Sequence, residues 1–349
     1  MQLFLYAYAA HTSVYHIPLA VVDQSRDPKS REFIQALVNS QYFDVTLQVQ
    51  SQAEVIDAID KGDVRAGLVI PPEFATTTDR GTANVLMLVD GSDSASAGAG
   101  ARAASLVAQS YAVQLASARI VRSGGAITPS SSNPALPITA TARVLYNPDM
   151  IDIWFILPGL IGLLLQTLAV QQAAIVVVRE RELGTIEQIL ITPTRPLELV
   201  LAKMIPLLFL SLIVMGLIVG LGIFWFGVPF RGSLFIYFWL ALLFIASSLG
   251  LGLLISNRSH TQREAVQSSL ATMLFGMLLS GWIYPQAAMP PILQFIGNLI
   301  PMAYFLRISR GLFTKGVGLE FVWSDALVLA IYACVVVLIA AKNFKKRLD

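Results

Sequence analysis

Long apolar stretches separated by short polar ones make up the second half of the chain. Residues 153–178, 204–230 and 232–257 contain no Asp, Glu, Lys or Arg. Each stretch exceeds the roughly 20 apolar residues that an α-helix needs to cross about 30 Å of hydrocarbon. The pattern therefore predicts an α-helical integral membrane protein with spans at about 153–178, 204–226, 233–257, 265–284 and 321–341.

The stretch from 265 to 306 is also uncharged, but it is too long for one helix and contains Pro285, Pro290, Pro291 and Pro301. Because proline interrupts helices, we expect the span to end near residue 284. Residues 286–316 should then form broken helices that enter the outer leaflet without crossing it. Protein must cover irregular backbone at that depth, because the hydrocarbon offers no hydrogen bonds.

The first half follows a different pattern, in which short apolar runs alternate with polar, helix-forming segments. Asp27-Pro28 predicts the start of one helix, and the capping box Ser51-Gln52-Ala53-Glu54 starts another that ends at Gly62. This pattern predicts an α+β or α/β domain outside the membrane over residues 14–147. Its strands are expected at 17–22, 43–50, 64–70, 84–89 and 138–145, and its helices at 30–40, 51–62, 73–80 and 94–122.

Three aspartates at the ends of predicted strands, Asp23, Asp90 and Asp93, raise the question of a catalytic or metal-binding cluster. Aspartate before a turn more often caps a helix or forms an Asx turn through its side chain. We therefore favour a structural role for all three.

The N-terminal residues 1–10 are apolar but only about half as long as a span. They lack the basic start and the small-residue cleavage site of a signal peptide. We interpret residues 1–13 as the outer end of a first transmembrane helix whose beginning is missing, either because the chain is truncated or because its start is misassigned. Residues 148–349 then form the remaining transmembrane domain, for six spans in all.

Charge is distributed unevenly along the chain, whose net charge is +2. Residues 1–150 hold ten Lys or Arg against thirteen Asp or Glu, whereas residues 151–349 hold fourteen against nine. The loops after the spans at 153–178 and 233–257, together with the C-terminus, carry ten Lys or Arg, and the opposite short loops carry four. Cytoplasmic loops are enriched in Lys and Arg. The C-terminus is therefore predicted to be cytoplasmic and the large domain extracytoplasmic.

A charged island, residues 179–196, lies between the first two uncharged stretches and must contact water. Within it, Leu183, Ile186, Ile189 and Leu190 recur at helical spacing, which predicts a short amphipathic helix at the membrane surface. The residues alone leave two interpretations open. The charges could anchor helix ends at the lipid headgroups, or the helix could bind a partner.

The island resembles the ABC-2 type transporter permease family, in its subgroup of multidrug-export-like permeases with a large domain between the first two spans. Residues 179–190 read RERELGTIEQIL and are followed by Thr192-Pro193, similar to the family pattern R-E-x-E-x-G-T-x-E-Q-L and T-P. The resemblance implies a six-span exporter-type fold, with residues 179–193 as a cytoplasmic coupling helix seated on a separate ATP-hydrolysing subunit. The residues expected at this contact are Arg179, Glu180, Arg181, Glu182, Gly184, Thr185, Glu187, Gln188 and Pro193.

The same resemblance implies partners and a location. It implies a second permease copy, identical or paralogous, with ATP and Mg²⁺ bound by the ATPase subunit and no cofactor in this chain. It places the chain as a multi-pass protein in the bacterial inner membrane, in contact with lipid and with its large domain in the periplasm. A periplasmic adaptor is a further expected kind of partner, and nucleic acid is not expected.

A second set of residues lies near the predicted broken helices. The residues 279–281, Leu-Ser-Gly, and the prolines after them resemble the family's sequence in this region. Arg307, Arg310 and Lys315 follow on the outer side, against the charge bias. They could bind lipid phosphates or an anionic substrate, or simply cap the broken helices. The residues of this expected outer gate or lipid and substrate contact are Pro285, Pro290, Pro301, Arg307 and Arg310.

Several kinds of catalytic chemistry have no signature in the sequence. The chain contains no G-x-x-x-x-G-K-[ST] phosphate loop, no H-E-x-x-H and no G-x-S-x-G. Cys334 is the only cysteine, and the three histidines lack ligand spacing. Asp325 is the only acidic residue within a predicted span, which leaves no buried relay for a proton or sodium gradient. We therefore expect no enzymatic activity in this chain.

These observations favour a permease subunit of an ATP-binding cassette exporter that moves a hydrophobic or amphipathic, drug-like substrate outward. The alternative is a non-transporting membrane scaffold or sensor whose extracytoplasmic domain binds a ligand. A neighbouring gene for an ATPase subunit would favour the first hypothesis, and one for a kinase would favour the second. Gly216, Gly220, Gly222, Gly250 and Gly252 allow close helix approach, either within one subunit or at a dimer face.

Overall fold

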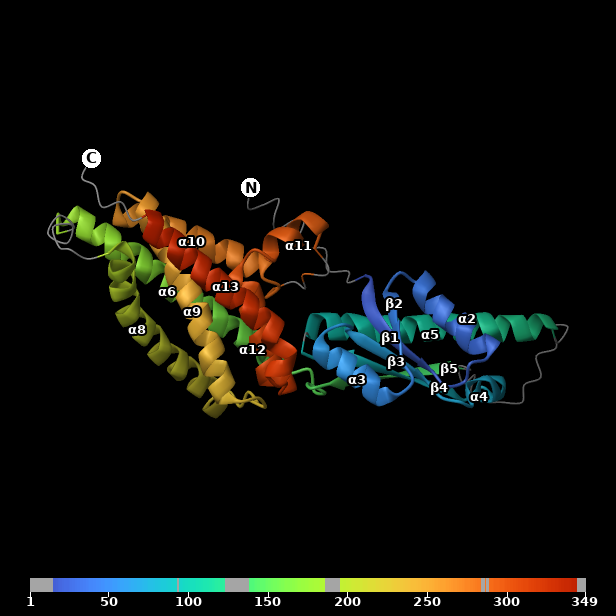
Figure 1. The fold of residues 1–349 in the computed structure, drawn as a ribbon. Coiled ribbons are helices and arrows are strands. Elements are labelled where there is room, and N and C mark those ends of the chain that lie inside the picture. The colour runs from blue at the N-terminus through green and yellow to red at the C-terminus, as the bar shows by residue number, and fades with distance from the viewer. Residues whose placement is uncertain are drawn as a thin grey trace. The chain divides into compact units, whose positions relative to one another are not determined.

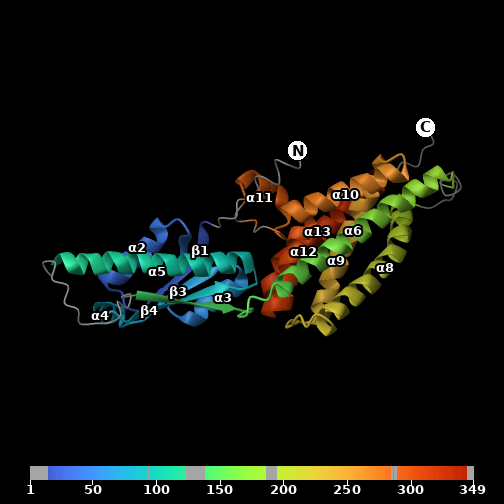
Figure 2. The ribbon, with the colours of Figure 1, turned by 180° about the vertical axis from the view of Figure 1, so that it is seen from behind.

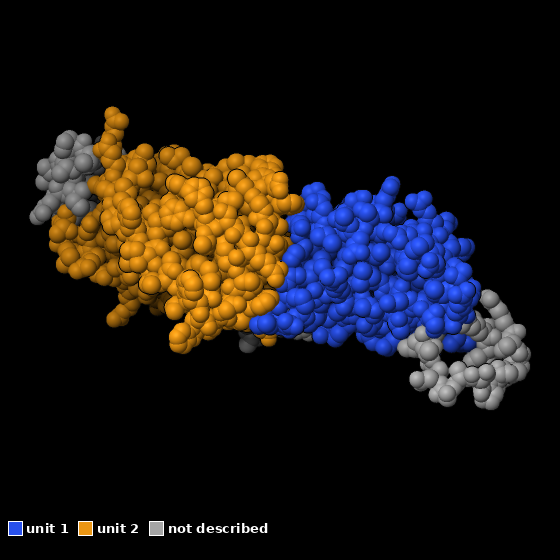
Figure 3. All heavy atoms as spheres, turned by 90° about the horizontal axis from the view of Figure 1, so that it is seen from below, with its two compact units in different colours: residues 1–151 blue, residues 152–349 orange. Residues whose placement is uncertain are grey.

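The structure is a computed structural model that describes residues 15–92, 94–122, 138–185, 195–283, 286 and 289–343. The chain divides into two compact units, residues 1–151 and residues 152–349 (Figure 3). Each unit has its own apolar clusters, and each is described here by itself.

Unit 1 is built on a five-stranded sheet with the strand order β2-β1-β3-β4-β5 (Figure 1). Neighbouring strands are parallel except for β3 and β4, which are antiparallel. The predicted strands and helices of this half are confirmed, with ends that differ by one or two residues. Their bounds are β1 Ile17–Asp23, α2 Pro28–Asn39, β2 Phe43–Gln48, α3 Gln52–Lys61, β3 Ala66–Ile70, α4 Phe74–Arg80, β4 Ala83–Asp90, α5 Ser94–Arg122 and β5 Ile138–Leu145.

Helices cover both faces of this sheet because side chains along a strand point alternately to its two sides. Leu19 and Val21 of β1 belong to the same buried cluster as Phe33 of α2 and residues of α5. Ala20 and Val22 belong instead to the cluster on the α3 side. Figure 2 shows α5 running along the sheet. Strand β1 is therefore buried on both faces, as its continuous apolar sequence predicts.

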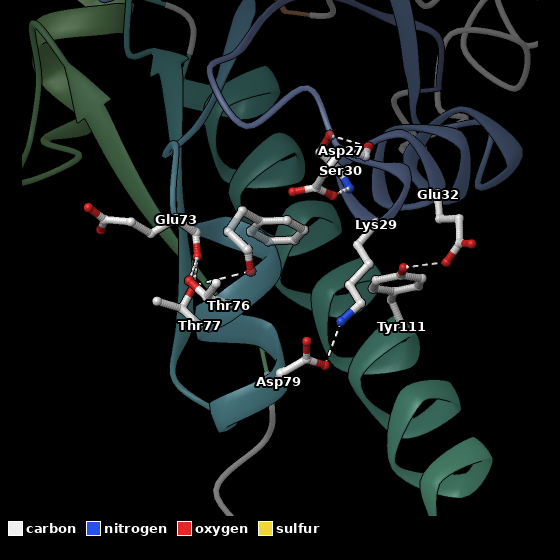
Figure 4. Close-up of polar contacts among 10 residues, drawn as sticks. Asp27, Lys29, Ser30, Glu32, Glu73, Thr76, Thr77, Asp79 and Tyr111 are labelled. Carbon is white, nitrogen blue, oxygen red and sulfur yellow. Dashed lines mark hydrogen bonds and ion pairs between the residues drawn. The ribbon is translucent and has the colours of Figure 1, made fainter. Parts of the chain in front are cut away.

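Polar side chains join three of these helices (Figure 4). Lys29 of α2 forms an ion pair with Asp79 of α4. The hydroxyl of Tyr111 on α5 donates a hydrogen bond to Oε2 of Glu32 on α2, at 3.1 Å. Burial raises the pKa of Tyr111, and the nearby Glu32 carboxylate raises it further, so the phenol keeps its proton and remains a donor.

The described aspartates at strand ends stabilise turns, as expected. Oδ1 of Asp23 accepts hydrogen bonds from the backbone amides of Ser25 at 3.1 Å and Arg26 at 2.9 Å. Asp90 accepts one from the amide of Ser92 at 3.0 Å and pairs with Arg65. These are Asx-turn contacts, which confirms the structural role of both residues. Asp93 lies outside the described residues.

Unit 2 is helical. Within the described part of the chain, four helices are long and apolar enough to cross a membrane: α6, α8 from Leu197 onward, α9 and α13. The bent pair formed by α11 and the helical stretch Pro301–Lys315, with an angle of 84°, would make a fifth if it counts as one span. The bounds are α6 Asp152–Glu182, α8 Pro196–Phe224, α9 Leu234–Arg258, α10 Gln262–Leu279, α11 Pro291–Gly297, α12 Pro301–Arg310, the π-helix Gly311–Lys315 and α13 Leu319–Asn343.

Two helices begin earlier than the predicted spans, and each start has a local cause. Helix α8 begins at Pro196 rather than near 204, because Glu198 accepts a hydrogen bond from the backbone amide of Arg195 and caps the first turn. Helix α10 begins at Gln262, with Thr261 as its N-cap, and ends before residue 284. It is not among the helices apolar enough to cross a membrane in the described chain, so the span at 265–284 stays a prediction.

Glycines let the long helices of unit 2 approach closely. A Cβ at Gly252 of α9 would lie 2.4 Å from the backbone oxygen of Val170 on α6. A Cβ at Gly250 would lie 2.9 Å from Val336 of α13, and one at Gly222 would lie 2.4 Å from Leu157. These three glycines therefore serve packing within one chain. A Cβ added at Gly216 or Gly220 would have no atom of the described residues within 4 Å.

Candidate functional site

The charged island begins as the end of helix α6. Arg179, Glu180, Arg181 and Glu182 continue the helix beyond its apolar part, and the turn 183–185 follows. Gly184 has φ 72° and lies in the left-handed region, and its amide donates to the carbonyl of Arg181 at 3.2 Å. Glycine adopts this conformation without steric cost and often ends a helix. Helix α6 therefore ends within the island, and residues 186–194 lie outside the described residues, so the predicted amphipathic surface helix stays a prediction.

Glu180 connects the end of α6 to α8. Its carboxylate forms a salt bridge with Nζ of Lys203. The Lys203 side chain is only 9% exposed and that of Glu180 is 28% exposed. A lysine with so little solvent requires a counter-charge, because removing an ammonium group from water is costly. The pair therefore ties the second turn of α8 to α6.

The next two residues connect α6 to the junction between α9 and α10. Nη1 of Arg181 donates to the backbone oxygen of Ser259, the residue that caps α9, at 2.9 Å. Oε1 of Glu182 accepts from the backbone amide of Gln262 at 2.8 Å, and the Gln262 side chain donates to the same carboxylate. Gln262 is the first residue of α10, where a negative charge is favourable next to the helix dipole.

Three successive side chains thus bind three different partners: α8, the end of α9 and the start of α10. Arg179, Leu183 and Gly184 remain exposed beside them, and Leu183 is 66% exposed. The hydroxyl of Thr185 donates to the backbone oxygen of Glu180 at 3.2 Å and closes the turn. The exposed residues therefore form a solvent-facing surface. The side chains beside it link α6 to α8, α9 and α10. Glu187, Gln188 and Pro193 lie outside the described residues.

Arg307, which the sequence placed at an outer gate or lipid contact, is engaged inside the protein. Its guanidinium donates to the carboxylate of Asp325 on α13, with Nη2 and Oδ1 2.8 Å apart. Nη1 donates to Oε1 of Gln286 at 3.3 Å, and the guanidinium lies 4.6 Å from the centre of the Tyr304 ring. The contacts join α12 to α13, which favours the structural role left open by the sequence.

Arg310 lies one turn further along α12 and also binds protein groups. Its guanidinium donates to the backbone oxygens of Gly281 and Trp282, both at 3.3 Å. It also lies 4.1 Å from the centre of the Phe155 ring on α6. These contacts satisfy the carbonyls that follow the end of α10, where irregular backbone needs hydrogen-bond donors.

The prolines of this region set where its short helices begin. Pro290 precedes α11 as its N-cap, and Pro301 is the first residue of α12. Proline is favoured at such positions because its missing amide would have no partner there. Pro285 lies outside the described residues.

The structure also shows residues that sequence reasoning missed. Lys203, Ser259 and Gln262 hold the island in place, but only Lys203 left a signal, as a lone cation near the start of an apolar helix. Gln166 of α6 is 1% exposed, and neither its amide nitrogen nor its amide oxygen has a hydrogen-bond partner among the described residues. No group of three or more His, Cys, Asp or Glu within the described ranges could hold a metal ion.

Comparison with known proteins identifies the family. Residues 1–342 match the model of the ABC-2 family transporter protein. Over 319 residues the chain is 31% identical to the probable multidrug ABC transporter permease YbhS of Escherichia coli K12, covering 90% of this chain and 81% of that protein. It is 27% identical to the corresponding permease YbhR, covering 93% and 85%. It is 26% identical to the inner membrane transport permease YhhJ, covering 60% and 56%. The chain therefore belongs to the ABC-2 family of transporter proteins.

Proposed function

We propose that this chain is the membrane-spanning subunit of an exporter driven by ATP that a separate cytoplasmic subunit hydrolyses. Two permease copies, identical or paralogous, would assemble with a pair of ATPase subunits, which bind the ATP and Mg²⁺. Unit 1 would face the periplasm and the C-terminus the cytoplasm, with the helices of unit 2 in the inner membrane. The match to the ABC-2 family and the names of the permease relatives support this proposal.

The observation that carries the proposal is the linkage of Glu180, Arg181 and Glu182 to three other helical elements. The ATPase would press on the exposed surface around Arg179 and Leu183. Because each neighbouring side chain holds a different helix, a displacement of this surface would move α6, α8 and the α9–α10 junction together. An isolated anchor at the headgroups would need no such connections.

The proposed substrate is hydrophobic or amphipathic. Two relatives are named multidrug permeases, which supports a drug-like compound. The apolar parts of the described spans carry few charges, and Asp325, which lies within one of them, pairs with Arg307. A strongly charged substrate would find little compensation along such helices, because an unpaired charge in hydrocarbon is costly.

Replacement of Glu182 by Arg tests the coupling role. The chain is purified with its ATP-binding cassette subunit and placed in vesicles, and ATP hydrolysis and ATP-dependent uptake of the dye Hoechst 33342 are both measured. The variant puts a cation against the positive end of α10 and breaks the contact with Gln262. We expect at least a tenfold loss of dye uptake while hydrolysis by the copurified ATPase persists.

Glu73→Arg serves as the matched control, because Glu73 is an exposed glutamate of unit 1 that lies outside the island in the sequence. It should keep both activities. Unchanged dye uptake in Glu182→Arg would contradict coupling through this segment. Absence of ATP-dependent uptake in the unmodified protein would contradict the exporter proposal for this dye class.

A further inference from the structure

A hollow of about 610 Å³ lies in unit 1 at the carboxyl ends of strands β1 and β2. Val21 and Asp23 come from the end of β1 and residues 48–50 from the end of β2. Helix α2 supplies Arg31, Ile34 and Gln35. Strands β1 and β2 are parallel neighbours, so their carboxyl ends lie at the same edge of the sheet. The volume lies within the usual range of small-molecule sites. Nothing in the transport proposal uses this hollow.

Arg26 is held at the rim of the hollow in an unusual backbone conformation. Its φ is 53°, in the left-handed region that a residue with a Cβ adopts at a cost of about 1 kcal/mol. The carboxylate of Asp23 fixes this turn through the amides of Ser25 and Arg26. Glycine or asparagine would occupy the position with less strain. The long cationic side chain is therefore the feature that distinguishes this turn from an ordinary connection.

A second arginine, Arg31 of α2, lines the same hollow. Its Nη2 donates to the backbone oxygen of Arg26 at 3.5 Å, which brings the two residues together. Within the part of the chain that the structure describes, neither guanidinium forms a salt bridge. The only carboxylate in the lining, Asp23, already accepts hydrogen bonds from two amides and from the hydroxyl of Ser30.

The other residues that line the hollow indicate the chemistry of the rest of a ligand. Val21, Ile34 and Val49 supply apolar surface, and Gln48 and Gln50 supply polar groups. Two arginines and one aspartate give the lining a net charge of +1, which matches a single negative charge. Arginine binds carboxylates through paired N–H donors. A phosphate monoester, with a charge of about −1.5 to −2 at neutral pH, would be less well compensated.

We infer that this hollow is a binding site for a small organic carboxylate with an apolar body, held by Arg26 and Arg31. The carboxylate would lie against the two guanidinium groups, and the apolar body would cover Val21, Ile34 and Val49. The site needs no contribution from the membrane unit or from an ATPase subunit, so its test is independent of transport.

Binding of 4-phenylbutyrate and of its neutral analogue 4-phenylbutyramide to the full chain in lipid nanodiscs tests this site. Isothermal titration should give a Kd for the carboxylate of about 1 mM or tighter, the range expected for so few atoms. The carboxylate should bind at least tenfold more tightly than the amide. The variant Arg26→Gln/Arg31→Gln should lose this preference, because each charged hydrogen bond contributes about tenfold or more.

Two control variants separate binding from folding. Arg80→Gln removes an exposed arginine outside the hollow and should keep the full preference. Arg26→Gly relieves the left-handed strain, so it should keep the thermal unfolding midpoint while lowering carboxylate affinity at least fivefold. Three results would overturn the inference: no saturable binding, equal binding of the two compounds, or a preference that survives in Arg26→Gln/Arg31→Gln.

Discussion

At the scale of single residues, the pair Glu180 and Lys203 shows what a charge near the membrane requires. Lys203 is 9% exposed, and Glu180 is the acidic residue with which it pairs. Replacing Glu180 by Gln leaves the ammonium group buried without its counter-charge, which should lower the free energy of unfolding by about 3 kcal/mol. The thermal unfolding midpoint in detergent measures this effect.

The double variant Glu180→Gln/Lys203→Met is the matched control for that prediction. It removes the buried charge together with its partner and fills the space with a side chain of similar length. Replacing both members of a buried pair is often neutral. The double variant should therefore unfold nearer to the unmodified protein than Glu180→Gln does. Equal destabilisation by both variants would show that Lys203 does not depend on Glu180.

Gln166 presents the opposite case, a buried polar group with no hydrogen-bond partner among the described residues. Gln166 lies where α6, α10 and α12 meet. A Cβ added at Gly276 of α10 would lie 3.0 Å from Oε1 of Gln166 and 3.4 Å from Sδ of Met302 on α12. An unsatisfied buried amide costs free energy, so Gln166→Leu should stabilise the chain by about 1 kcal/mol. Gln172→Leu, on the same helix but only partly buried, should change the unfolding midpoint less. A lower midpoint for Gln166→Leu would contradict the prediction.

At the scale of elements, close helix contacts depend on where a glycine faces. Gly252→Ala would push a methyl group against the backbone of Val170, at 2.4 Å, and should destabilise the α6–α9 contact by about 2 kcal/mol. Gly216→Ala meets open space and should stabilise α8 by up to about 1 kcal/mol, because alanine favours helix. Opposite shifts of the two unfolding midpoints are expected. Equal destabilisation by both would contradict the packing described for α9.

Elements with local signals could be predicted from the sequence, and contacts between distant residues could not. Ser51 caps α3 by accepting from the amide of Glu54, and Gly62 ends that helix at φ 81°, as the local sequence predicts. The bond between Glu182 and Gln262 joins residues 80 positions apart, so no local pattern indicates it. The end of α6 inside the charged island was not predicted, because Gly184 interrupts an otherwise periodic pattern.

The structural interpretation of the outer arginines is favoured by the same kind of distant contact. Arg307 and Asp325 are 18 positions apart and belong to two different helices. Their charges are visible in the sequence, but their pairing depends on the turn between the helical stretch Pro301–Lys315 and α13, which begins at Leu319. The sequence could therefore indicate the region and its charges, while the choice between ligand contact and structural contact required the fold.

At the scale of the whole molecule, unit 1 and the charged island should lie on opposite sides of the membrane. Because the Lys and Arg bias predicts a cytoplasmic island and an extracytoplasmic unit 1, an odd number of crossings should separate them. Helix α6 supplies one crossing. The chain suits a direct test, since Cys334 is its only cysteine and can be replaced by Ser to give a cysteine-free background.

Two single-cysteine variants in that background determine the orientation. Thr46→Cys lies at an exposed position of β2 in unit 1, and Leu183→Cys lies at the 66% exposed residue of the island. In intact spheroplasts, a membrane-impermeant maleimide should label Thr46→Cys and leave Leu183→Cys unlabelled. Permeabilisation should then allow labelling of both, because both positions are exposed in the folded chain. Labelling of Leu183→Cys before permeabilisation would place the island outside the cell, where no ATPase subunit could reach it, and coupling through this segment would be impossible.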